Sequence, residues 1–81
     1  MLSELARSKK VTGLKQTKRA IVDGRARGVY IAEDAETRLR TELSELCRRY
    51  GVPEYPAESM RALGRACGVD IGASAAAILG E

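Results

Sequence analysis

The stretch GVYIA at residues 28–32 contains no charged side chain, and it decides which kind of fold the chain adopts. A strand with one face in water alternates apolar and polar residues, whereas a strand covered on both faces is apolar throughout. The run therefore predicts a central strand, and it requires helices on both faces of the sheet that contains it.

The segments before this strand alternate between helical and extended patterns. We expect a short first helix near residues 2–6, a brief strand over residues 10–12, and a helix over residues 14–22 that stops at Gly24. The inward face of that second helix is expected to contain Leu14, Thr17, Ala20 and Ile21.

The segments after the central strand continue this alternation. Asp34 is expected to cap a long helix that ends at Gly51, and Ser59 or Glu58 to start another helix that closes at Gly68. VPEYP at residues 52–56 and AAAIL at residues 75–79 are expected to be strands. The inward face of the long helix is expected to contain Leu39, Leu43, Leu46, Cys47 and Tyr50.

Strands that alternate with helices predict an α/β fold with a central sheet and helices on both faces. The 81 residues suffice for one modest core, so residues 1–81 are expected to form a single domain, and a hydrophobic content of 44% argues against disorder. No apolar run approaches the roughly 18 residues of a membrane span. Residues 1–10 also lack the apolar stretch of a signal peptide, so we expect a cytoplasmic protein with no membrane partner.

The residues that enzymes commonly use are missing. There is no histidine to act as a base, no serine or cysteine stands beside an activator, and the glycines match neither the P-loop nor the dinucleotide fingerprint. Cys47 and Cys67 form no CxxC pair and, without histidine, they do not complete a four-ligand zinc site. We expect a protein that is not an enzyme, that has no cofactor and no metal, and that keeps both thiols reduced and at least partly buried.

Charge is distributed unevenly along the chain. Residues 1–31 contain eight basic and two acidic side chains, a net charge of +6, whereas the remaining residues contain six basic and nine acidic ones, a net charge of −3. A basic half on a small domain favours an anionic partner, most often a nucleic acid, although many basic surfaces only face solvent.

The most specific basic cluster lies in GLKQTKRAI, residues 13–21. With Gly13 as the N-cap, Lys15, Gln16 and Arg19 fall in the first two helical turns, where free backbone amides also attract phosphate. Lys15 and Arg19 can donate hydrogen bonds to guanine, and Gln16 can both donate and accept. An equally simple alternative is that Gln16 completes a capping interaction and the cations only face solvent.

The shape of RNA restricts what such a helix end can read. The major groove of a regular RNA duplex is too narrow for side chains, so base edges are accessible only where loops, bulges or non-Watson–Crick pairs distort the duplex. The expected target is therefore structured RNA with a kink or a bulge.

Two separated motifs also resemble a known family. GLKQTKRAI is followed by DGRARGVYIAEDAE at residues 23–36, and ESMRALGRACGVDIGASAAAI occupies residues 58–78. In this order, from about Val11 to Leu79, they resemble the ribosomal protein L7Ae family, and its small bacterial, YbxF-like branch in particular. The resemblance implies a three-layer α/β/α sandwich with a four-stranded mixed sheet.

The resemblance also implies a partner. Members of the family bind kink-turns, which are bent RNA elements with tandem sheared G·A pairs. It implies a non-enzymatic protein that recognises and stabilises a kink-turn in ribosomal or regulatory RNA, that associates with the ribosome, and that is not expected to bind DNA. The implied RNA-binding residues are Gly13, Leu14, Lys15, Gln16, Lys18, Arg19, Glu36, Val69, Asp70 and Ile71.

These residues have different implied roles. The resemblance assigns close approach of the backbone to Gly13, and contact with the G·A pairs to the side chains at positions 15, 16 and 19. The loop at residues 69–71 would pack against unstacked nucleotides, and Glu36 would lie near the extruded base. Val69 and Ile71 also fit a core role at the start of the final strand.

The chain departs from the family pattern at three positions. Archaeal and eukaryotic members commonly have Asn and Glu where this chain has Lys15 and Gln16, and Thr where it has Leu14. Lysine donates without accepting, so RNA binding should survive while affinity and base preference remain open. The alternative function is a ribosome-associated module that binds protein or rRNA backbone without kink-turn specificity. Such generic binding would draw equally on Arg7, Lys9, Lys10, Arg25 and Arg27.

Overall fold

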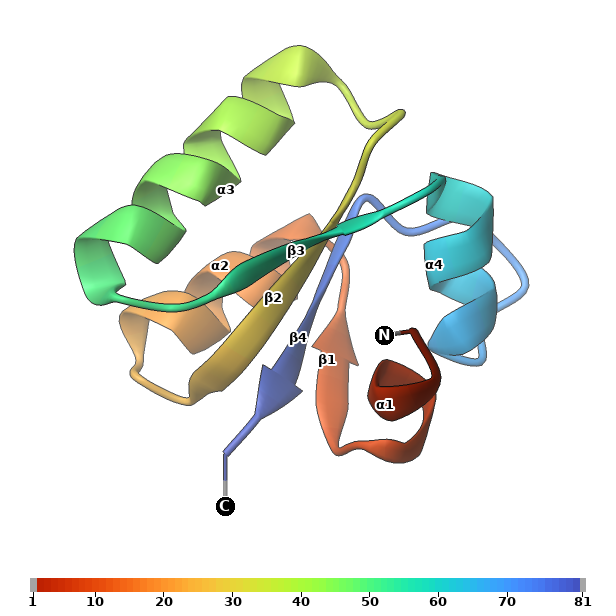
Figure 1. The fold of residues 1–81 in the computed structure, drawn as a ribbon, viewed down its shortest axis with the longest axis horizontal. Helices are drawn as coiled ribbons and strands as arrows, with labels where there is room; N and C mark the ends of the chain where they lie inside the picture. The colour runs from red at the N-terminus through yellow and green to blue at the C-terminus, as the bar shows by residue number, and fades with distance from the viewer. Residues whose placement is uncertain (1, 81) are drawn as a thin grey trace.

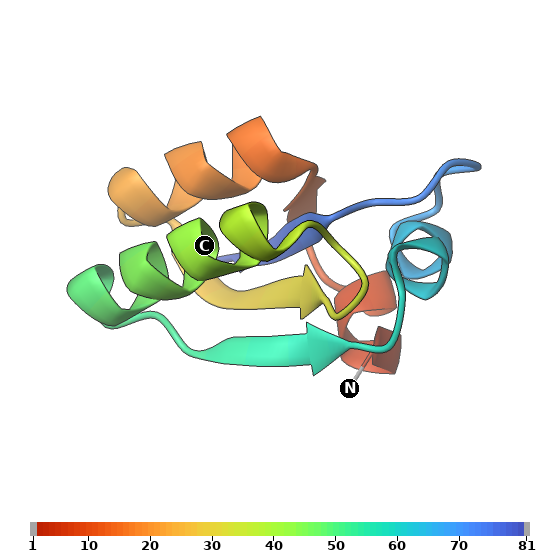
Figure 2. The same cartoon turned by 90° about the horizontal axis from the view of Figure 1, so that it is seen from above.

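A four-stranded mixed sheet organises residues 2–80, which are the residues that the computed structural model describes. The strands lie in the order β1 (Lys10–Thr12), β4 (Ala75–Leu79), β2 (Ala26–Ala32) and β3 (Glu54–Ala57). β2 and β3 are parallel, and the other neighbours are antiparallel. Helices α2 (Leu14–Val22) and α3 (Thr37–Tyr50) cover one face, and α1 (Leu2–Arg7) and α4 (Met60–Ala66) cover part of the other (Figures 1 and 2). The expected α/β/α sandwich is therefore confirmed.

Strand β2 supplies both cores, which is why its sequence is apolar without interruption. Val29 and Ile31 point into the core beneath α2 and α3, whereas Tyr30 and Ala32 point into the core beneath α1 and α4. All four side chains are at most 8% exposed. The sequence-based expectation of a doubly covered central strand is correct.

Most helix boundaries follow the capping residues. Gly24 and Gly51 have positive φ angles of 77° and 69° just after α2 and α3, as expected of helix stops. Ser59 is the N-cap of α4, and its hydroxyl oxygen accepts a hydrogen bond from the Ala62 N–H at 3.0 Å. Polar side chains that cap a helix end satisfy its free amides, so Ser59 rather than Glu58 starts this helix.

Two expectations about α3 were wrong. The helix begins at Thr37 with Glu36 as its N-cap, and Asp34 instead accepts a hydrogen bond from the Met60 N–H at the start of α4, at 2.7 Å. Asp34 thus supports a helix 26 residues away, a partner that only the tertiary structure brings near. Tyr50 is 45% exposed because it is the last residue of α3, where the chain reverses.

The two cysteines lie on opposite faces of the sheet. Cys47 is fully buried in the core beneath α2 and α3, and Cys67 packs against the core beneath α1 and α4, so the sheet separates the two thiols. Burial, with a smaller contribution from Glu54, raises the pKa of Cys47 to about 11. Within residues 2–80, no group of three or more histidine, cysteine or acidic residues is placed to hold a metal ion, and no helix has the length and apolarity to cross a bilayer.

The burial of Cys47 leads to a prediction about thiol reactivity. In native protein at pH 8, Ellman's reagent should modify Cys67 and should reach Cys47 only after unfolding. Because the folded-state pKa of Cys47 lies above that of an unfolded thiol, the free energy of unfolding should also fall as the pH rises from about 9 to about 11. A Cys47→Ala variant should lose this pH dependence. Equal reaction rates of the two native thiols, or stoichiometric zinc in the purified protein, would contradict the prediction.

Candidate nucleic-acid interface

Three segments that are far apart in the sequence meet at one end of the sheet. The Gly13 N–H donates to the Ala75 carbonyl oxygen at 2.8 Å, which joins the start of α2 to the start of β4. The Ala32 N–H donates to the Ser74 carbonyl oxygen at 2.9 Å, which brings the end of β2 to the same place. We call this region, formed by residues 13–19, 33–36 and 69–74, the candidate edge (Figures 1 and 2).

Gly13 turns the chain directly from β1 into α2. Its φ and ψ angles of 104° and 161° lie in a region that is essentially restricted to glycine. A Cβ atom there would meet nothing within 4 Å, so the backbone conformation and not the space demands glycine. The space in the direction of the missing side chain is therefore open to a ligand.

The first turn of α2 has no side-chain cap. Gln16 does not complete a capping interaction, because the Gly13 N–H is already bonded to Ala75 and the Gln16 side chain makes no hydrogen bond within residues 2–80. The capping alternative is therefore not what the structure shows. The free amides at this end carry partial positive charge, which favours an anion beside them.

The solvent-facing side of α2 has three candidate residues. Lys15, Gln16 and Arg19 are exposed, whereas the opposite side of the helix is buried against the sheet. At about 100° per residue, Lys15 and Arg19 stand nearly in line along the axis and Gln16 lies to one side of them. Leu14 is partly buried against the core beneath α2 and α3, so it packs at the base of this cluster.

Lys18 faces a different direction. Its ammonium group forms an ion pair with Glu42 of α3 at 2.7 Å, and the side chains of the two residues are 35% and 44% exposed. An ion pair this accessible to water contributes little to stability, about 0–1 kcal/mol. It does, however, neutralise Lys18 and turn it toward α3, so the structure does not place Lys18 with Lys15, Gln16 and Arg19.

The loop at residues 69–71 presents apolar side chains to water. Ile71 is 77% exposed and Val69 is 37% exposed, and Asp70 between them is exposed as well. A core role for Ile71, which the sequence left open, is therefore wrong. Val69 and Ile71 are two of the four large apolar side chains that residues 2–80 expose, so apolar surface is concentrated in this loop.

Gly64 holds the loop in place, and the sequence-based reading gave it no role. A Cβ atom on Gly64 would collide with the Ile71 carbonyl oxygen, so only glycine lets residues 71–72 lie directly on α4. The Gly64 carbonyl oxygen accepts from the Val69 N–H at 3.0 Å, and the Met60 carbonyl oxygen accepts from the Ala73 N–H at the same distance. The LGRACG motif could have indicated this role, because a glycine inside a helix usually marks a position where another segment packs closely.

Glu36 completes the candidate edge. It is exposed, it occupies the N-cap of α3, and its side chain makes no cap hydrogen bond. The Glu33 N–H donates to the Ala57 carbonyl oxygen at 2.8 Å, and the Asp34 carboxylate is bonded to α4, so the turn that carries Glu36 is anchored on both sides. A free carboxylate at this position can only accept hydrogen bonds, such as those from the amino groups of a base.

Comparison with known proteins places the chain in a family. A sequence model of the ribosomal protein L7Ae/L30e/S12e/Gadd45 family matches residues 2–81, and the chain belongs to this family. It is 38% identical over 81 residues to RNA-binding protein TTE2299 of Caldanaerobacter subterraneus, with 99% of each chain covered. It is 40% identical over 75 residues to RNA-binding protein YbxF of Geobacillus stearothermophilus, with 93% of this chain and 92% of the relative covered.

Solved structures share the fold. The Giardia lamblia 15.5kD RNA binding protein superposes with a TM-score of 0.85 at 29% identity, over 99% of this chain and 68% of that one. A protein of unknown function from Bacillus halodurans superposes with a TM-score of 0.82 at 26% identity, over 95% of this chain and 79% of that one. The family and fold expected from the two sequence motifs are therefore confirmed.

The close contact between Gly64 and the loop leads to a prediction about RNA affinity. Gly64→Ala should displace Ile71, because the added methyl group and the Ile71 carbonyl oxygen need the same space. RNA affinity should fall, and the losses from Gly64→Ala and Ile71→Ala should not add in a double-mutant cycle. Arg61→Ala, an exposed change on the same helix, is the control. Additive losses would show that Gly64 does not act through Ile71.

Proposed function

We propose that this protein binds structured RNA without catalysing a reaction, and that it recognises and stabilises kink-turns in ribosomal or regulatory RNA as a ribosome-associated cytoplasmic protein. Membership of the L7Ae family and relatives named as RNA-binding proteins support RNA as the partner. The observation that carries the proposal is that an uncapped helix start and an exposed apolar loop share one edge of the sheet. A kink-turn offers phosphates and unstacked bases to one surface, and these two features match them.

In the proposed complex, α2 approaches the bent part of the RNA with its N-terminus. The uncapped amides and the open backbone at Gly13 accommodate a phosphate group or a sugar. Lys15 and Arg19 donate to the acceptor atoms of the guanines in the G·A pairs, and Gln16 both donates and accepts. A regular duplex would not admit this helix end, so the interaction selects RNA that is already bent or able to bend.

The loop contributes the apolar part of the proposed interface. Ile71 and Val69 cover nucleotides that leave the stack, which removes the apolar faces of the bases and of these side chains from water. Asp70 and Glu36 accept hydrogen bonds from amino groups of those bases. The two carboxylates also disfavour close approach of further phosphates, and this restricts the orientation of the RNA on the edge.

The departures from the family pattern have a direct chemical consequence in this proposal. Lys15 offers donors only, and Gln16 lacks the carboxylate that takes two guanine donors. We therefore expect weaker discrimination among base pairs and a larger contribution of phosphates to the affinity. Leu14 is half-buried at the base of the cluster, so its replacement of a threonine alters helix packing more than base contacts.

A generic backbone-binding module is the second candidate function. It would use every basic side chain of the first 31 residues, yet the structure does not gather those residues on one surface. Lys15 and Arg19 lie at the candidate edge, whereas Lys9, Lys10 and Arg27 lie at the opposite ends of β1 and β2. Lys10 in addition donates to the Ala6 and Ser8 carbonyl oxygens at 3.2 and 3.0 Å. Specific binding at the candidate edge would not involve this second group.

Substitutions on α2 separate the two functions. Lys15→Ala and Arg19→Ala should each weaken binding of a blunt-ended kink-turn by about 1–3 kcal/mol, the range for good base contacts. Lys9→Ala, which removes an exposed cation just before β1 and away from the candidate edge, should have far less effect on this blunt RNA. Binding is measured by gel shift with the kink-turn and with the same RNA in which Watson–Crick pairs replace the G·A pairs. Equal losses for all three variants, on both RNAs, would support the generic module instead.

Salt dependence separates the apolar loop from the cations. Ile71→Ala should lower kink-turn affinity with almost no change in the slope of log K against log salt concentration, because an apolar contact releases no counterions. A Lys18→Ala variant should change the slope by less than about 1, the value for a full phosphate contact, because Lys18 is already paired with Glu42. Titrations between 50 and 300 mM KCl would measure both slopes. Unchanged affinity of Ile71→Ala would contradict the two-part interface.

A further inference from the structure

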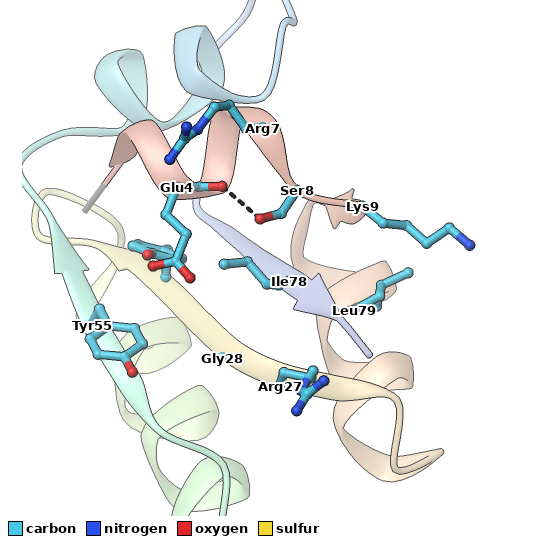
Figure 3. A pocket seen from close by; sticks show the side chains of 10 residues that line it. Glu4, Arg7, Ser8, Lys9, Arg27, Gly28, Tyr55, Ile78 and Leu79 are labelled. Atoms are coloured by element: carbon cyan, nitrogen blue, oxygen red, sulfur yellow. Dashed lines mark hydrogen bonds between the residues drawn. The ribbon is translucent and has the colours of Figure 1, made fainter. Parts of the chain in front are cut away.

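The sheet face beneath α1 and α4 is only partly covered. These helices have six and seven residues and leave the opposite half of the face open, where a groove of about 800 Å³ remains. We call it the sheet-face groove (Figure 3), and α1, β2, β3 and β4 form its walls. Its lining includes Arg7, Lys9, Arg27, Gly28, Tyr55 and Ile78.

The floor of this groove is aromatic. The rings of Tyr55 and Tyr30 lie with their centroids 5.3 Å apart at an angle of 37°, and Tyr30 is buried whereas Tyr55 is partly exposed. Gly28 makes room for Tyr55, because a Cβ atom there would lie 3.2 Å from Cε2 of the ring. The Tyr55 ring therefore rests on β2, and Tyr55 and Ile78 both line the groove.

A β-bulge adds Arg27 to the same face. Ala26 pairs with Leu79 and Gly28 pairs with Ile78, so Arg27 is one extra residue on β2. Regular alternation would turn Arg27 away from the face that contains Gly28, but the bulge re-aims its side chain. The aliphatic part of Arg27 passes over Gly80, where a Cβ atom would lie 3.1 Å from Cγ and Cδ.

Cations dominate the rim of the groove. Arg7, Lys9 and Arg27 are exposed, and none of them forms an ion pair within residues 2–80. Burial, with a smaller contribution from Glu4, raises the pKa of Tyr30, and Glu4 is the one carboxylate among the lining residues. Figure 3 shows the Glu4 side chain reaching into the groove toward Tyr55, whereas Lys9 and Arg27 extend outward at its rim.

We propose that the sheet-face groove is a second RNA site that binds a single-stranded segment with little sequence preference. One base stacks on Tyr55 beside Ile78, and Arg7, Lys9 and Arg27 bind the flanking phosphates. An accessible aromatic ring next to unpaired cations is the combination that single-stranded nucleic acids require, because every base has a face that stacks. The inference rests on the proposed function in that RNA is the partner, but it does not depend on kink-turn recognition.

The two sites are placed to bind one RNA together. β2 runs from the bulge at the groove to the candidate edge, a length of about 20 Å for seven residues. A single strand that leaves a bent element at the candidate edge needs only a few nucleotides to reach the groove. Binding of the tail then becomes intramolecular, and a modest second site strengthens the complex without new contacts at the kink.

The test uses a fluorescent oligouridine of about eight nucleotides, which has no kink-turn and no duplex. Tyr55→Leu, which keeps an apolar side chain but removes the ring, should weaken its binding about fivefold or more, as expected for loss of one stacked base. Arg27→Ala, which removes an exposed charge and no core contact, should weaken it about threefold and lower the salt slope by about 1. Tyr50→Leu and Arg49→Ala are matched controls at the far end of α3 and should leave binding unchanged.

Two kink-turn RNAs distinguish this inference from the proposed function. Tyr55→Leu should leave binding of a blunt kink-turn unchanged and abolish the affinity gained by adding a single-stranded tail. Failure of kink-turn recognition would instead appear with the blunt RNA and leave the oligouridine result intact. The groove proposal is overturned if Tyr55→Leu and Tyr50→Leu bind oligouridine equally while both remain folded, or if oligouridine shifts amide resonances only at the candidate edge. It is also overturned if Tyr55→Leu only removes a concentration-dependent dimer, which would make the face an interface between two copies.

Discussion

Burial of β2 on both faces is the constraint on which the rest of the structure depends. Tyr30 and Ala32 face one core, Val29 and Ile31 face the other, and an uncovered face would leave large apolar side chains in water. Two pairs of helices are therefore needed in a chain of only 81 residues, and α1 and α4 are too short to cover their face completely. Half of that face, with its groove, is open because these two helices are short.

Two glycines give the candidate edge its exposed backbone and its exposed apolar side chains. Gly13 adopts a conformation that other residues rarely adopt, and Gly64 lets a loop rest on a helix without an intervening side chain. The consequence is an edge at which amides are uncapped and Ile71 points into water. Such features cost stability in an isolated protein, and a partner that covers them offsets that cost.

The basic half of the chain becomes two surfaces in the folded protein. Lys15 and Arg19 lie beside the start of α2, whereas Arg7, Lys9 and Arg27 surround an aromatic floor at the other end of the sheet. Lys18 belongs to neither group, because Glu42 neutralises it. The net charge of the sequence therefore indicates that the protein attracts anions. The positions of the cations in the fold indicate how many separate contacts an anion can make.

Local pattern determined the order of the helices and strands and the doubly covered β2, because apolar periodicity and glycine stops act over a few residues. The family came instead from the resemblance of two motifs, GLKQTKRAI and LGRACG. The basic cluster on α2 could also be predicted from the sequence, since residues three and four apart share a helix face. Only the tertiary structure decided that Asp34 supports α4, that Lys18 is paired, and that Ile71 is exposed. The sheet-face groove likewise depends on a bulge that reverses the alternation of one strand, and on Tyr55 and Gly28 meeting across neighbouring strands. These features arise from contacts between residues that are distant in the chain, and the spacing of residues along the sequence does not determine such contacts.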